Sequence, residues 1–402
     1  MRILWVKVGG LWPLNMGGRL RSFHTIEDLA RRHRVTVLTT HGPGDDAASL
    51  EAQLSGCERV ASVPFAIPKA GTSRFAAALA RSWLSPYPAD LWKCRVPALQ
   101  AGVREAMASG VDICVADFLV AAPNVPLAGP VPTILFEHNV EHMIWKRLHD
   151  VERGLLRRAL LTIEWRKMRR YEAWACRRAH LTVAVSEADR ARLSACSPHA
   201  DIRAIPTGVD TTYFQPNGTV EKPGALVFTG SMDWYPNEDA ILHFISSALP
   251  EVRRHVPGVT LAVVGRNPSA RLKEAGAAVG VRVTGTVADV RPHIAEAAVY
   301  VVPLRVGGGT RLKIFEALAM GKAVVATTVG AEGLPIVPGE HYVRADEPGE
   351  FARAVVELLG RPERRRALGS AGRSLVETRY SWAQIGRQFE SLCEEVAATH
   401  AC

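Results

Sequence analysis

The sequence predicts an α/β protein made of two doubly wound, Rossmann-like domains, each with a parallel sheet. Short apolar runs and helical patterns follow one another along the chain. In a half-exposed strand apolar and polar residues would alternate, whereas each of these runs is apolar at consecutive positions. Such strands are buried on both faces, as in parallel sheets covered by helices. The length of 402 residues also exceeds what one hydrophobic core usually supports. Open sheets of this kind bind ligands at the carboxyl ends of their strands, so we expect two domains that face an interdomain cleft.

The expected strands fall into two groups separated by a segment rich in Pro, Gly, Thr and Asn. We expect strands at 2–8, 34–40, 112–117, 132–138 and 181–186, and then at 225–230, 259–265, 281–285, 299–304 and 323–329. The interruption predicts a linker. The expected organisation is therefore a first domain at 1–205, a linker at 206–224 and a second domain at 225–378. Residues 379–402 predict a closing helix, which either packs back on the first domain or simply caps the chain.

Charge and cysteine usage narrow the class of protein. Lys and Arg outnumber Asp and Glu by 49 to 40, which favours phosphorylated ligands, an anionic membrane surface or nucleic acid as partners. Neither an aromatic RNA-binding motif nor zinc-finger spacing accompanies the charge, so we expect no nucleic acid. The seven scattered cysteines contain no CxxC pair, which favours reduced thiols in the cytoplasm. Neither a membrane-length apolar run nor a signal peptide is predicted.

Three consecutive glycines, Gly307 to Gly309, separate the strand at 299–304 from an amphipathic helix. Backbone N–H groups at such a strand-to-helix turn, with the positive end of the helix dipole, favour an anion, usually phosphate. Thr310, Lys313 and Glu316 are three residues apart and share the polar helix face. A carboxylate at Glu316 suits ribose hydroxyls, and Arg311 and Lys313 suit phosphate oxygens. A glycine-rich turn with a solvated helix face is the alternative, and the complete arrangement disfavours it.

Four segments of the second half carry a specific resemblance. These are "FTGSMDWYPNEDA" (228–240), "VVGRNP" (263–268), "VTGTVADVRPHIAEA" (283–297) and "VPLRVGGGTRLKIFEALAMGKAVVATTVGAEGL" (302–334). Together they resemble the donor-binding half of a GT-B glycosyltransferase of family 4, in the subgroup with "VGGGTRLK". The first half resembles the family more loosely, through "FEHN", "VAVSEADR" (183–190) and "IPTGVDTTYF" (205–214).

The resemblance implies a retaining, metal-independent hexosyltransferase that uses a nucleotide-diphosphate sugar and needs no cofactor. The sequence agrees on the metal, because it contains no Asp-x-Asp triplet to bind Mg²⁺ or Mn²⁺. The acceptor would be a hydroxyl-bearing sugar, a lipid-linked molecule or a small molecule. Biosynthesis of a surface polysaccharide or glycoconjugate is the expected setting, with glycosylation of a small natural product as the alternative. A sugar-nucleotide epimerase would need further acid/base carboxylates, which no motif shows.

The same resemblance assigns roles on the donor side. It implies that Glu316 holds the ribose, and it places the remaining donor residues around the diphosphate, the sugar and the base: Gly230, Ser231, Arg266, Thr286, Val287, Asp289, Gly308, Gly309, Thr310, Arg311 and Lys313. Gly308 stands where the family often has a glutamate. This departure keeps a non-catalytic sugar-nucleotide-binding protein open as an alternative.

In the first domain, the loop at Gly17, Gly18 and Arg19 and the strand end at His138 and Asn139 are the expected acceptor side. The resemblance implies that His138 is catalytic together with Glu316, by hydrogen-bonding a hydroxyl near the donor sugar. His138 also begins an H-x-x-E-H pattern of zinc peptidases, but a histidine at a strand end does not share one helix face with the next, so we expect no zinc site. A histidine with a purely structural role is a further alternative.

The segment 154–180 predicts a basic amphipathic helix. It could rest on an anionic membrane at the inner face of the cell, which would suit a lipid-linked acceptor. An arginine-rich solvated face over an ordinary core stripe is the alternative interpretation.

Overall fold

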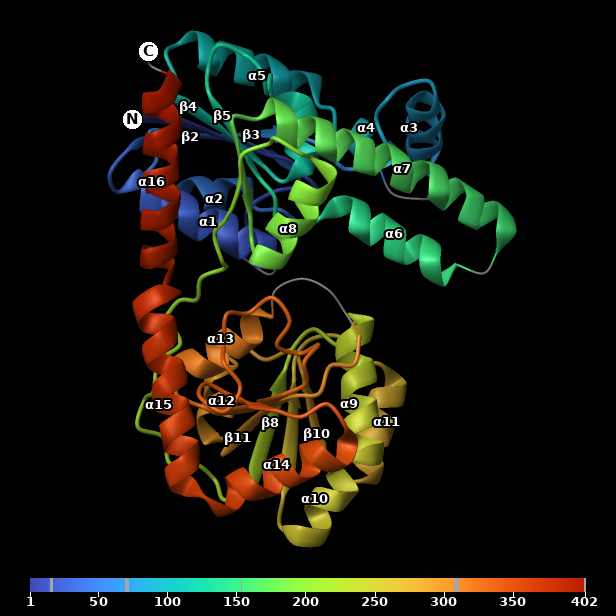
Figure 1. Ribbon diagram of the computed structural model, residues 1–402, viewed down its shortest axis with the longest axis vertical. Coiled ribbons are helices and arrows are strands. Elements are labelled where there is room, and N and C mark those ends of the chain that lie inside the picture. Colours follow the sequence, from blue (N-terminus) through green and yellow to red (C-terminus); the bar gives the residue numbers. More distant parts are fainter. Residues whose placement is uncertain (15–16, 69–71, 153, 307–310, 401–402) are drawn as a thin grey trace. The chain divides into compact units, whose positions relative to one another are not determined.

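The computed structural model describes residues 1–14, 17–68, 72–152, 154–306 and 311–400 (Figure 1). The chain divides into two compact units. Unit 1 comprises Met1–Pro206 and Ile385–Cys402, and unit 2 comprises Thr207–Gln384. The chain crosses between them twice, once after Pro206 and once within its last helix.

Unit 1 contains a seven-stranded parallel sheet in the order β3-β2-β1-β4-β5-β6-β7. The order reverses between β1 and β4, which is the switch point at which doubly wound sheets bind ligands. Its strands are β1 (Arg2–Lys7), β2 (Arg34–His41), β3 (Arg59–Pro64), β4 (Ile113–Asp117), β5 (Thr133–Phe136), β6 (Leu181–Ala184) and β7 (Ile202–Ala204).

Helices cover both faces of this sheet. They are α1 (Gly17–Ala30), α2 (Ala47–Gln53), α3 (Ser73–Trp83), α4 (Ala89–Trp92), α5 (Pro97–Ala108), the 3₁₀ turn η1 (Leu119–Asn124), α6 (Glu141–Val151), α7 (Leu155–Arg178) and α8 (Glu187–Cys196). Side-chain caps fix several helix starts: the Ser186 hydroxyl accepts from the Asp189 N–H at 3.1 Å where α8 begins. Helices α6 and α7 run side by side as a hairpin (Figure 1).

Unit 2 repeats the design with six parallel strands in the order β10-β9-β8-β11-β12-β13. The strands are β8 (Ala225–Thr229), β9 (Thr260–Val264), β10 (Arg282–Gly285), β11 (Val299–Val302), β12 (Ala323–Ala326) and β13 (Val343–Arg344). The helices are α9 (Tyr235–Ser247), α10 (Leu249–His255), α11 (Ala270–Ala278), α12 (Arg291–Glu296), α13 (Leu312–Ala319), α14 (Pro348–Gly360) and α15 (Pro362–Arg379). The two sheets and their helices confirm the predicted fold class.

The last helix, α16 (Trp382–His400), packs on the core of unit 1 from Ile385 onward. The buried Phe389 ring lies 5.6 Å from Trp5 and 5.0 Å from Phe136, measured between ring centroids. Arg32, two residues beyond α1, donates from Nε to both carboxylate oxygens of Glu390 at 2.8 and 2.9 Å. Within the described residues, no helix is long and apolar enough to cross a bilayer.

We expect Phe389→Ala to lower the free energy of unfolding by about 3–5 kcal/mol, because it removes a buried ring from an aromatic cluster and leaves a cavity. Urea denaturation followed by tryptophan fluorescence measures this loss. Gln388→Ala, at an exposed position of the same helix, is the matched control and should change stability by less than about 0.5 kcal/mol. Equal stability of the two variants would contradict the packing described for α16.

Candidate functional site

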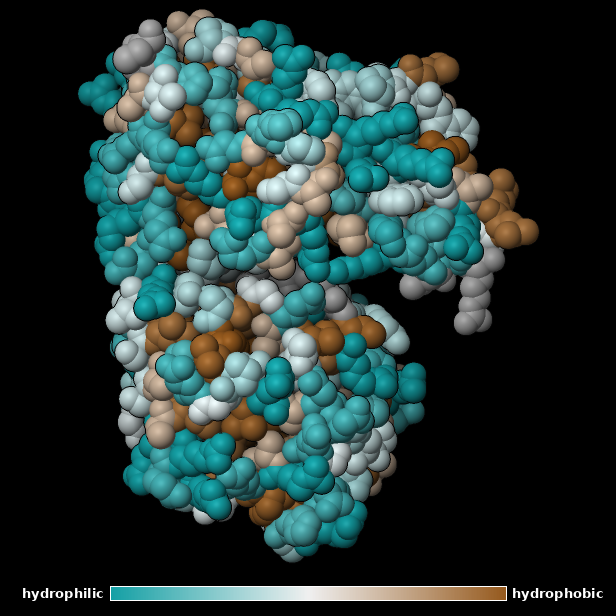
Figure 2. Space-filling view, viewed as in Figure 1, coloured by the Kyte–Doolittle hydropathy of each residue, from teal (hydrophilic) through white to brown (hydrophobic). Residues whose placement is uncertain are grey.

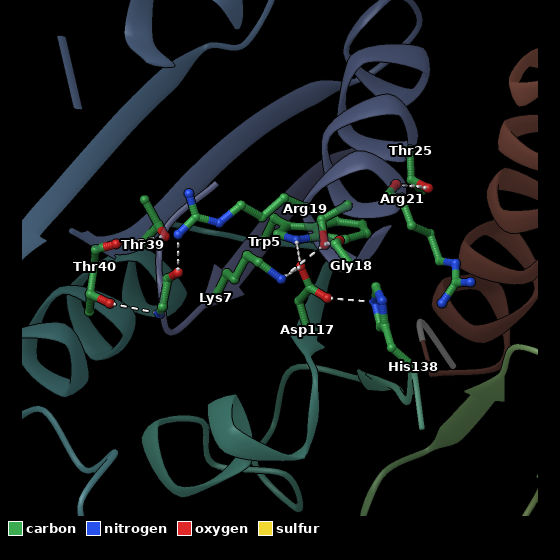
Figure 3. A network of polar contacts seen from close by, with 12 residues as sticks. Trp5, Lys7, Gly18, Arg19, Arg21, Thr25, Thr39, Thr40, Asp117 and His138 are labelled. Carbon is green, nitrogen blue, oxygen red and sulfur yellow. Dashed lines mark hydrogen bonds and ion pairs between the residues drawn. The ribbon is translucent and has the colours of Figure 1, made fainter. Parts of the chain in front are cut away.

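In unit 1, strand register brings two charged residues together at the carboxyl edge of the sheet. Lys7 ends β1 and Asp117 ends β4, and the two are register partners. Lys7 Nζ donates to Asp117 Oδ2 at 3.0 Å, and the Trp5 indole N–H donates to the same oxygen at 3.0 Å (Figure 3). Lys7 Nζ also contacts the Ser22 hydroxyl on α1 at 3.0 Å. This buried ion pair ties β1, β4 and α1 together at the switch point.

His138 completes this network from the end of β5. Its Nε2 lies 2.9 Å from Asp117 Oδ1 (Figure 3). Burial lowers the pKa of His138 to about 3, against the opposing effect of Asp117. The imidazole is therefore neutral at physiological pH. Burial would raise the pKa of Asp117, but Lys7 and His138 hold it below its ordinary value, so the carboxylate stays ionised.

The Phe118 ring covers one face of the His138 imidazole. Its ring stacks on the imidazole with 3.7 Å between centroids, and Lys7 Nζ lies 4.1 Å from its centre. Phe118 has a φ of 68°, which is unfavourable for a non-glycine residue. A Cβ at Gly18 would lie 2.5 Å from the Phe118 ring. Glycine at position 18 is therefore required by this close approach of α1.

Arg19 and Gly17, the other residues predicted in the β1–α1 loop, differ from Gly18 in what surrounds them. Arg19 donates to Asp45 Oδ1 at 2.6 Å and to the Gly9 carbonyl at 3.1 Å. It thereby closes the loop after β1. Gly17 is the exposed first residue of α1. Gly18 therefore lies against Phe118 and accepts from the Ser22 hydroxyl at 2.8 Å, whereas Arg19 holds the neighbouring loop.

The two histidines of the H-x-x-E-H pattern belong to different networks. His142 lies in the first turn of α6, where its Nδ1 contacts Glu172 on α7. Glu172 also accepts from the backbone N–H of Glu141 at 2.7 Å and of His142 at 3.2 Å. Asn139 is half-buried, and its amide makes a long 3.5 Å contact with Glu141. The pattern therefore positions α6, while His138 faces Asp117.

In unit 2, Gly230, Ser231 and Arg266 meet at the carboxyl ends of β8 and β9. Arg266 Nε donates to the Ser231 hydroxyl at 2.7 Å. The Asn237 amide of α9 donates to the Ser231 carbonyl at 2.8 Å. A Cβ at Gly265 would lie 1.7 Å from the Gly230 carbonyl oxygen, so the two strand ends approach as closely as glycine allows.

Helix α13 adds two cations to the same edge. Lys313 Nζ donates to Asn237 Oδ1 at 2.8 Å and lies 4.1 Å from the centre of the Phe228 ring. The buried Arg311 precedes the helix, with its guanidinium 5.2 Å from the Trp234 ring. Burial, with repulsion from Arg311, lowers the pKa of Lys313 to about 7. A bound anion would favour the charged form of this lysine.

Glu316 lies one helical turn beyond Lys313 and is half-buried. Burial raises its pKa to about 7, against the opposing effect of Lys313. Burial, with a smaller effect of Glu316, raises the pKa of Tyr300, whose hydroxyl contacts Thr229 at the end of β8. The Glu316 carboxyl thus lies on the same helix as Lys313. A carboxylate there can accept hydrogen bonds from hydroxyl groups, while the cations beside it can bind phosphate.

The remaining predicted donor residues lie beyond β10. Thr286 is exposed and Val287 is half-buried. Asp289 accepts two bonds from Arg291 Nε at 3.0 Å, and the Arg291 guanidinium stacks 3.8 Å from the centre of the Tyr213 ring. Gly308, Gly309 and Thr310 lie outside the described residues.

Several residues of these networks are absent from the sequence-based predictions, among them Lys7, Asp117 and Asn237. Lys7 and Asp117 carried a usable signal, because each is a charge at the end of an otherwise apolar buried strand. Asn237 carried none, since an asparagine in the first turn of a helix is ordinary.

Family models match most of the chain. A model described as "Glycosyltransferase Family 4" matches residues 21–213, and one described as "Glycosyl transferases group 1" matches residues 223–361. The first therefore falls mainly on unit 1 and the second on unit 2.

Curated relatives match about half of the chain. A GDP-mannose-dependent alpha-(1-6)-phosphatidylinositol monomannoside mannosyltransferase of Mycolicibacterium smegmatis is 30% identical over 241 residues, covering 53% of this chain and 62% of the relative. A phosphatidyl-myo-inositol mannosyltransferase of Mycobacterium tuberculosis is 30% identical over 216 residues, covering 50% and 56%. The match thus spans less than two thirds of either relative.

Solved structures share the fold over nearly the whole length. Sucrose-phosphate synthase from Thermosynechococcus elongatus has a TM-score of 0.71 at 17% identity and covers 98% of this chain and 99% of that one. HepE from Anabaena, in complex with UDP, has a TM-score of 0.70 at 15% identity, with coverage of 98% and 100%. With both family models in chain order on two doubly wound units, this chain belongs to the GT-B glycosyltransferases of family 4.

Proposed function

We propose that this chain is a retaining, metal-independent glycosyltransferase that moves a hexose from a nucleotide-diphosphate sugar to a hydroxyl acceptor in glycoconjugate biosynthesis. The observation that carries the proposal is the convergence of Arg266, Lys313 and Glu316 at one sheet edge of unit 2. GDP-mannose is the first donor to test, because the M. smegmatis relative is named for it.

The donor diphosphate would meet cations that are already in place. Arg266 is fixed by Ser231, and Lys313 is fixed by Asn237. Positioned cations stabilise the negative charge that develops on a leaving phosphate without further reorganisation. With the absence of an Asp-x-Asp triplet from the sequence, this supports stabilisation of the leaving group by side chains and backbone N–H groups in place of a metal.

Retention of configuration would follow from a reaction on one face of the sugar. The bond between the anomeric carbon and the leaving phosphate oxygen breaks, and the acceptor oxygen forms a bond on the same face. The hydroxyl proton passes to an oxygen of the departing diphosphate, which leaves as the nucleoside diphosphate. The transition state has oxocarbenium character, as in other glycosyl chemistry. This scheme requires no nucleophile from the protein.

His138 would act as a neutral hydrogen-bonding group in this scheme. Its pKa of about 3 rules out a role as a cation at physiological pH. Nε2 lies 2.9 Å from Asp117 Oδ1, and among the described residues neither ring nitrogen makes a hydrogen bond of good geometry. Both nitrogens are covered, so direct contact with a sugar hydroxyl requires the covering groups to move. We propose that Asp117 orients the ring for this contact.

A lipid-linked acceptor at the inner face of the membrane fits the surface of α7. Leu155 and Leu156 at the start of this helix are 86% and 78% exposed, and Figure 2 shows hydrophobic surface at that end of the α6–α7 hairpin. Exposed arginines follow along the helix at positions 157, 158, 166 and 169. Apolar side chains beside arginines favour an anionic lipid surface.

For Glu316→Gln we expect roughly a 10- to 100-fold loss of affinity for the donor that wild type uses, because a neutral amide accepts weaker hydrogen bonds from ribose than a carboxylate does. Isothermal titration with GDP-mannose, UDP-glucose and ADP-glucose measures it. Glu332→Gln, at an exposed position of unit 2, serves as the control. Unchanged donor affinity in Glu316→Gln would reject the proposed site.

Turnover tests the reaction itself. We expect nucleoside diphosphate to be released only when a hydroxyl acceptor is present, with a rate unchanged by EDTA, and we expect NMR of the product to show the anomeric configuration of the donor. Inhibition by EDTA with rescue by Mg²⁺ or Mn²⁺ would reject metal independence. Donor binding without turnover across a broad acceptor panel would instead indicate a non-catalytic sugar-nucleotide-binding protein.

The neutral state of His138 predicts a pH dependence of stability. Its pKa is lowered on folding, so the unfolded chain takes up a proton as pH falls through about 6.5 while the folded chain does not. Stability that is complete above pH 6.5 is therefore lost toward acid, by about 2 kcal/mol between pH 7 and pH 5. Urea denaturation at both pH values should show this loss reduced by about that amount in His138→Gln. The exposed His255→Gln should retain the wild-type loss, and an identical loss in all three proteins would contradict the assignment.

A further inference from the structure

Unit 1 contains a pocket of about 800 Å³ between α3, the loop that follows it and α7. This volume is within the range of pockets that hold small molecules and cofactors. The wall is mainly apolar and aromatic and includes Trp83, Tyr87, Leu160, Ile163, Tyr171 and Trp174. None of these residues belongs to the Lys7–Asp117–His138 network.

Packed aromatic rings form one side of this α3–α7 pocket. The Tyr171 ring lies 5.1 Å from Tyr87 and 5.3 Å from Trp174, between centroids. Trp83 and Trp174 nevertheless remain 55% and 41% exposed, and Ile163 is 48% exposed. Large apolar side chains that gather around one hollow and stay exposed indicate a site for an apolar ligand.

The α3–α7 pocket is also positively charged. Lys167 and Arg170 line it, and none of its lining residues is acidic. Lys167 Nζ donates to the Ser82 carbonyl at 2.6 Å, which ties α7 to the end of α3. Arg170 is exposed. An apolar hollow with cations beside it complements a molecule with a hydrocarbon chain and an anionic head.

The inner wall of the pocket is linked to the segment that carries His138. Tyr171 precedes Glu172, which holds the first turn of α6 through the backbone N–H groups of Glu141 and His142. Burial, with smaller effects of Tyr87 and the carboxyl of Glu137, raises the pKa of the Tyr171 hydroxyl. Glu137 is the chain neighbour of His138. A ligand bound here would therefore lie on the α7 side of the candidate acceptor site in unit 1.

We propose that the α3–α7 pocket binds the hydrocarbon chain of a phosphate-bearing acceptor lipid, with Arg170 and Lys167 beside the phosphate. The word acceptor rests on the proposed function. The pocket is a hollow walled by rings and suits a hydrocarbon chain, whereas the exposed start of α7 is an open surface suited to the membrane as a whole.

Binding of a monomeric lipid analogue tests the pocket without any sugar donor. Dodecyl phosphate below its micellar concentration should change the emission of Trp83 and Trp174, and affinity should rise about fourfold per added methylene from octyl to dodecyl phosphate. Ile163→Asn should lower this affinity at least tenfold. Leu156→Asn, a matched change at an exposed position of α7 that does not line the pocket, should leave it unchanged.

A second pair of variants tests whether the positive charge of Arg170 contributes to binding of the phosphate. Arg170→Gln should weaken dodecyl phosphate binding roughly tenfold and leave binding of uncharged dodecyl maltoside unchanged. Arg169→Gln, on the same helix and outside the pocket, should have no effect on either. Equal losses in Arg170→Gln and Arg169→Gln would overturn the assignment of the phosphate to the pocket.

Vesicles of phosphatidylglycerol distinguish a chain-binding pocket from general membrane adsorption. We expect Leu156→Asn to reduce sedimentation with vesicles and Ile163→Asn to leave it unchanged, the reverse of their effects on dodecyl phosphate. If Ile163→Asn loses vesicle binding but retains dodecyl phosphate, the pocket serves the membrane surface and the proposal is overturned. It is also overturned if the wild type forms oligomers that Ile163→Asn dissolves, since a second copy would then occupy the pocket.

These outcomes separate the pocket from the proposed function. A chain that binds dodecyl phosphate through Ile163 and Arg170 but releases no nucleoside diphosphate would reject the transferase and retain the lipid site. A transferase whose variants bind dodecyl phosphate like the wild type would retain the proposed function and reject the pocket.

Discussion

The buried ion pair between Lys7 and Asp117 is the constraint on which the arrangement of unit 1 depends. Both side chains are almost fully buried, so each charge has lost its water and relies on the other. Removing one partner of such a pair typically costs 3–5 kcal/mol. Because the pair joins the ends of β1 and β4 at the switch point, it fixes the two strands in register. It also leaves Asp117 Oδ1 facing His138. The same carboxylate therefore joins β1 to β4 and contacts the histidine of the candidate acceptor site.

In unit 2 a chain of hydrogen bonds connects the sheet edge. It runs from Arg266 through Ser231 and Asn237 to Lys313 and so joins the ends of β8 and β9 to α9 and α13. Ser231 also donates to Asp233, whose carboxylate interacts with the charge of Arg266, and Glu316 acts on Lys313 in the same way. A bound diphosphate would bring further negative charge to Arg266 and Lys313, so donor binding and stabilisation of unit 2 should be coupled.

Sequence reasoning succeeded where burial is complete. Strands such as β4 and β11 are buried at every position and were predicted from their continuous apolar runs. The edge strand β3 was missed because its residues are half-exposed and show no continuous apolar run. In the site, the family resemblance supplied Ser231, Arg266 and Glu316 as donor residues, and their roles remain predictions. The Lys7–Asp117 contact could not, because it joins residues 110 positions apart and depends on a strand order that the sequence does not state. The triple-glycine prediction falls outside the described residues and remains a prediction.

The same reasoning explains why α7 was ambiguous in the sequence. Its arginines predicted either a membrane-facing surface or an ordinary solvated face, since helical periodicity cannot tell which apolar residues find partners. In the structure, the residues of α7 differ in how deeply they are buried. Met168, Glu172 and Cys176 face the core and are buried, whereas Leu155 and Leu156 stay in solvent. The α3–α7 pocket lies between these extremes, because there α3 and the loop after it approach exposed apolar side chains of α7 without covering them. An amphipathic helix that merely capped a core would bury its tryptophans, so the exposure of Trp174 beside Arg170 favours a ligand over a structural role for this face.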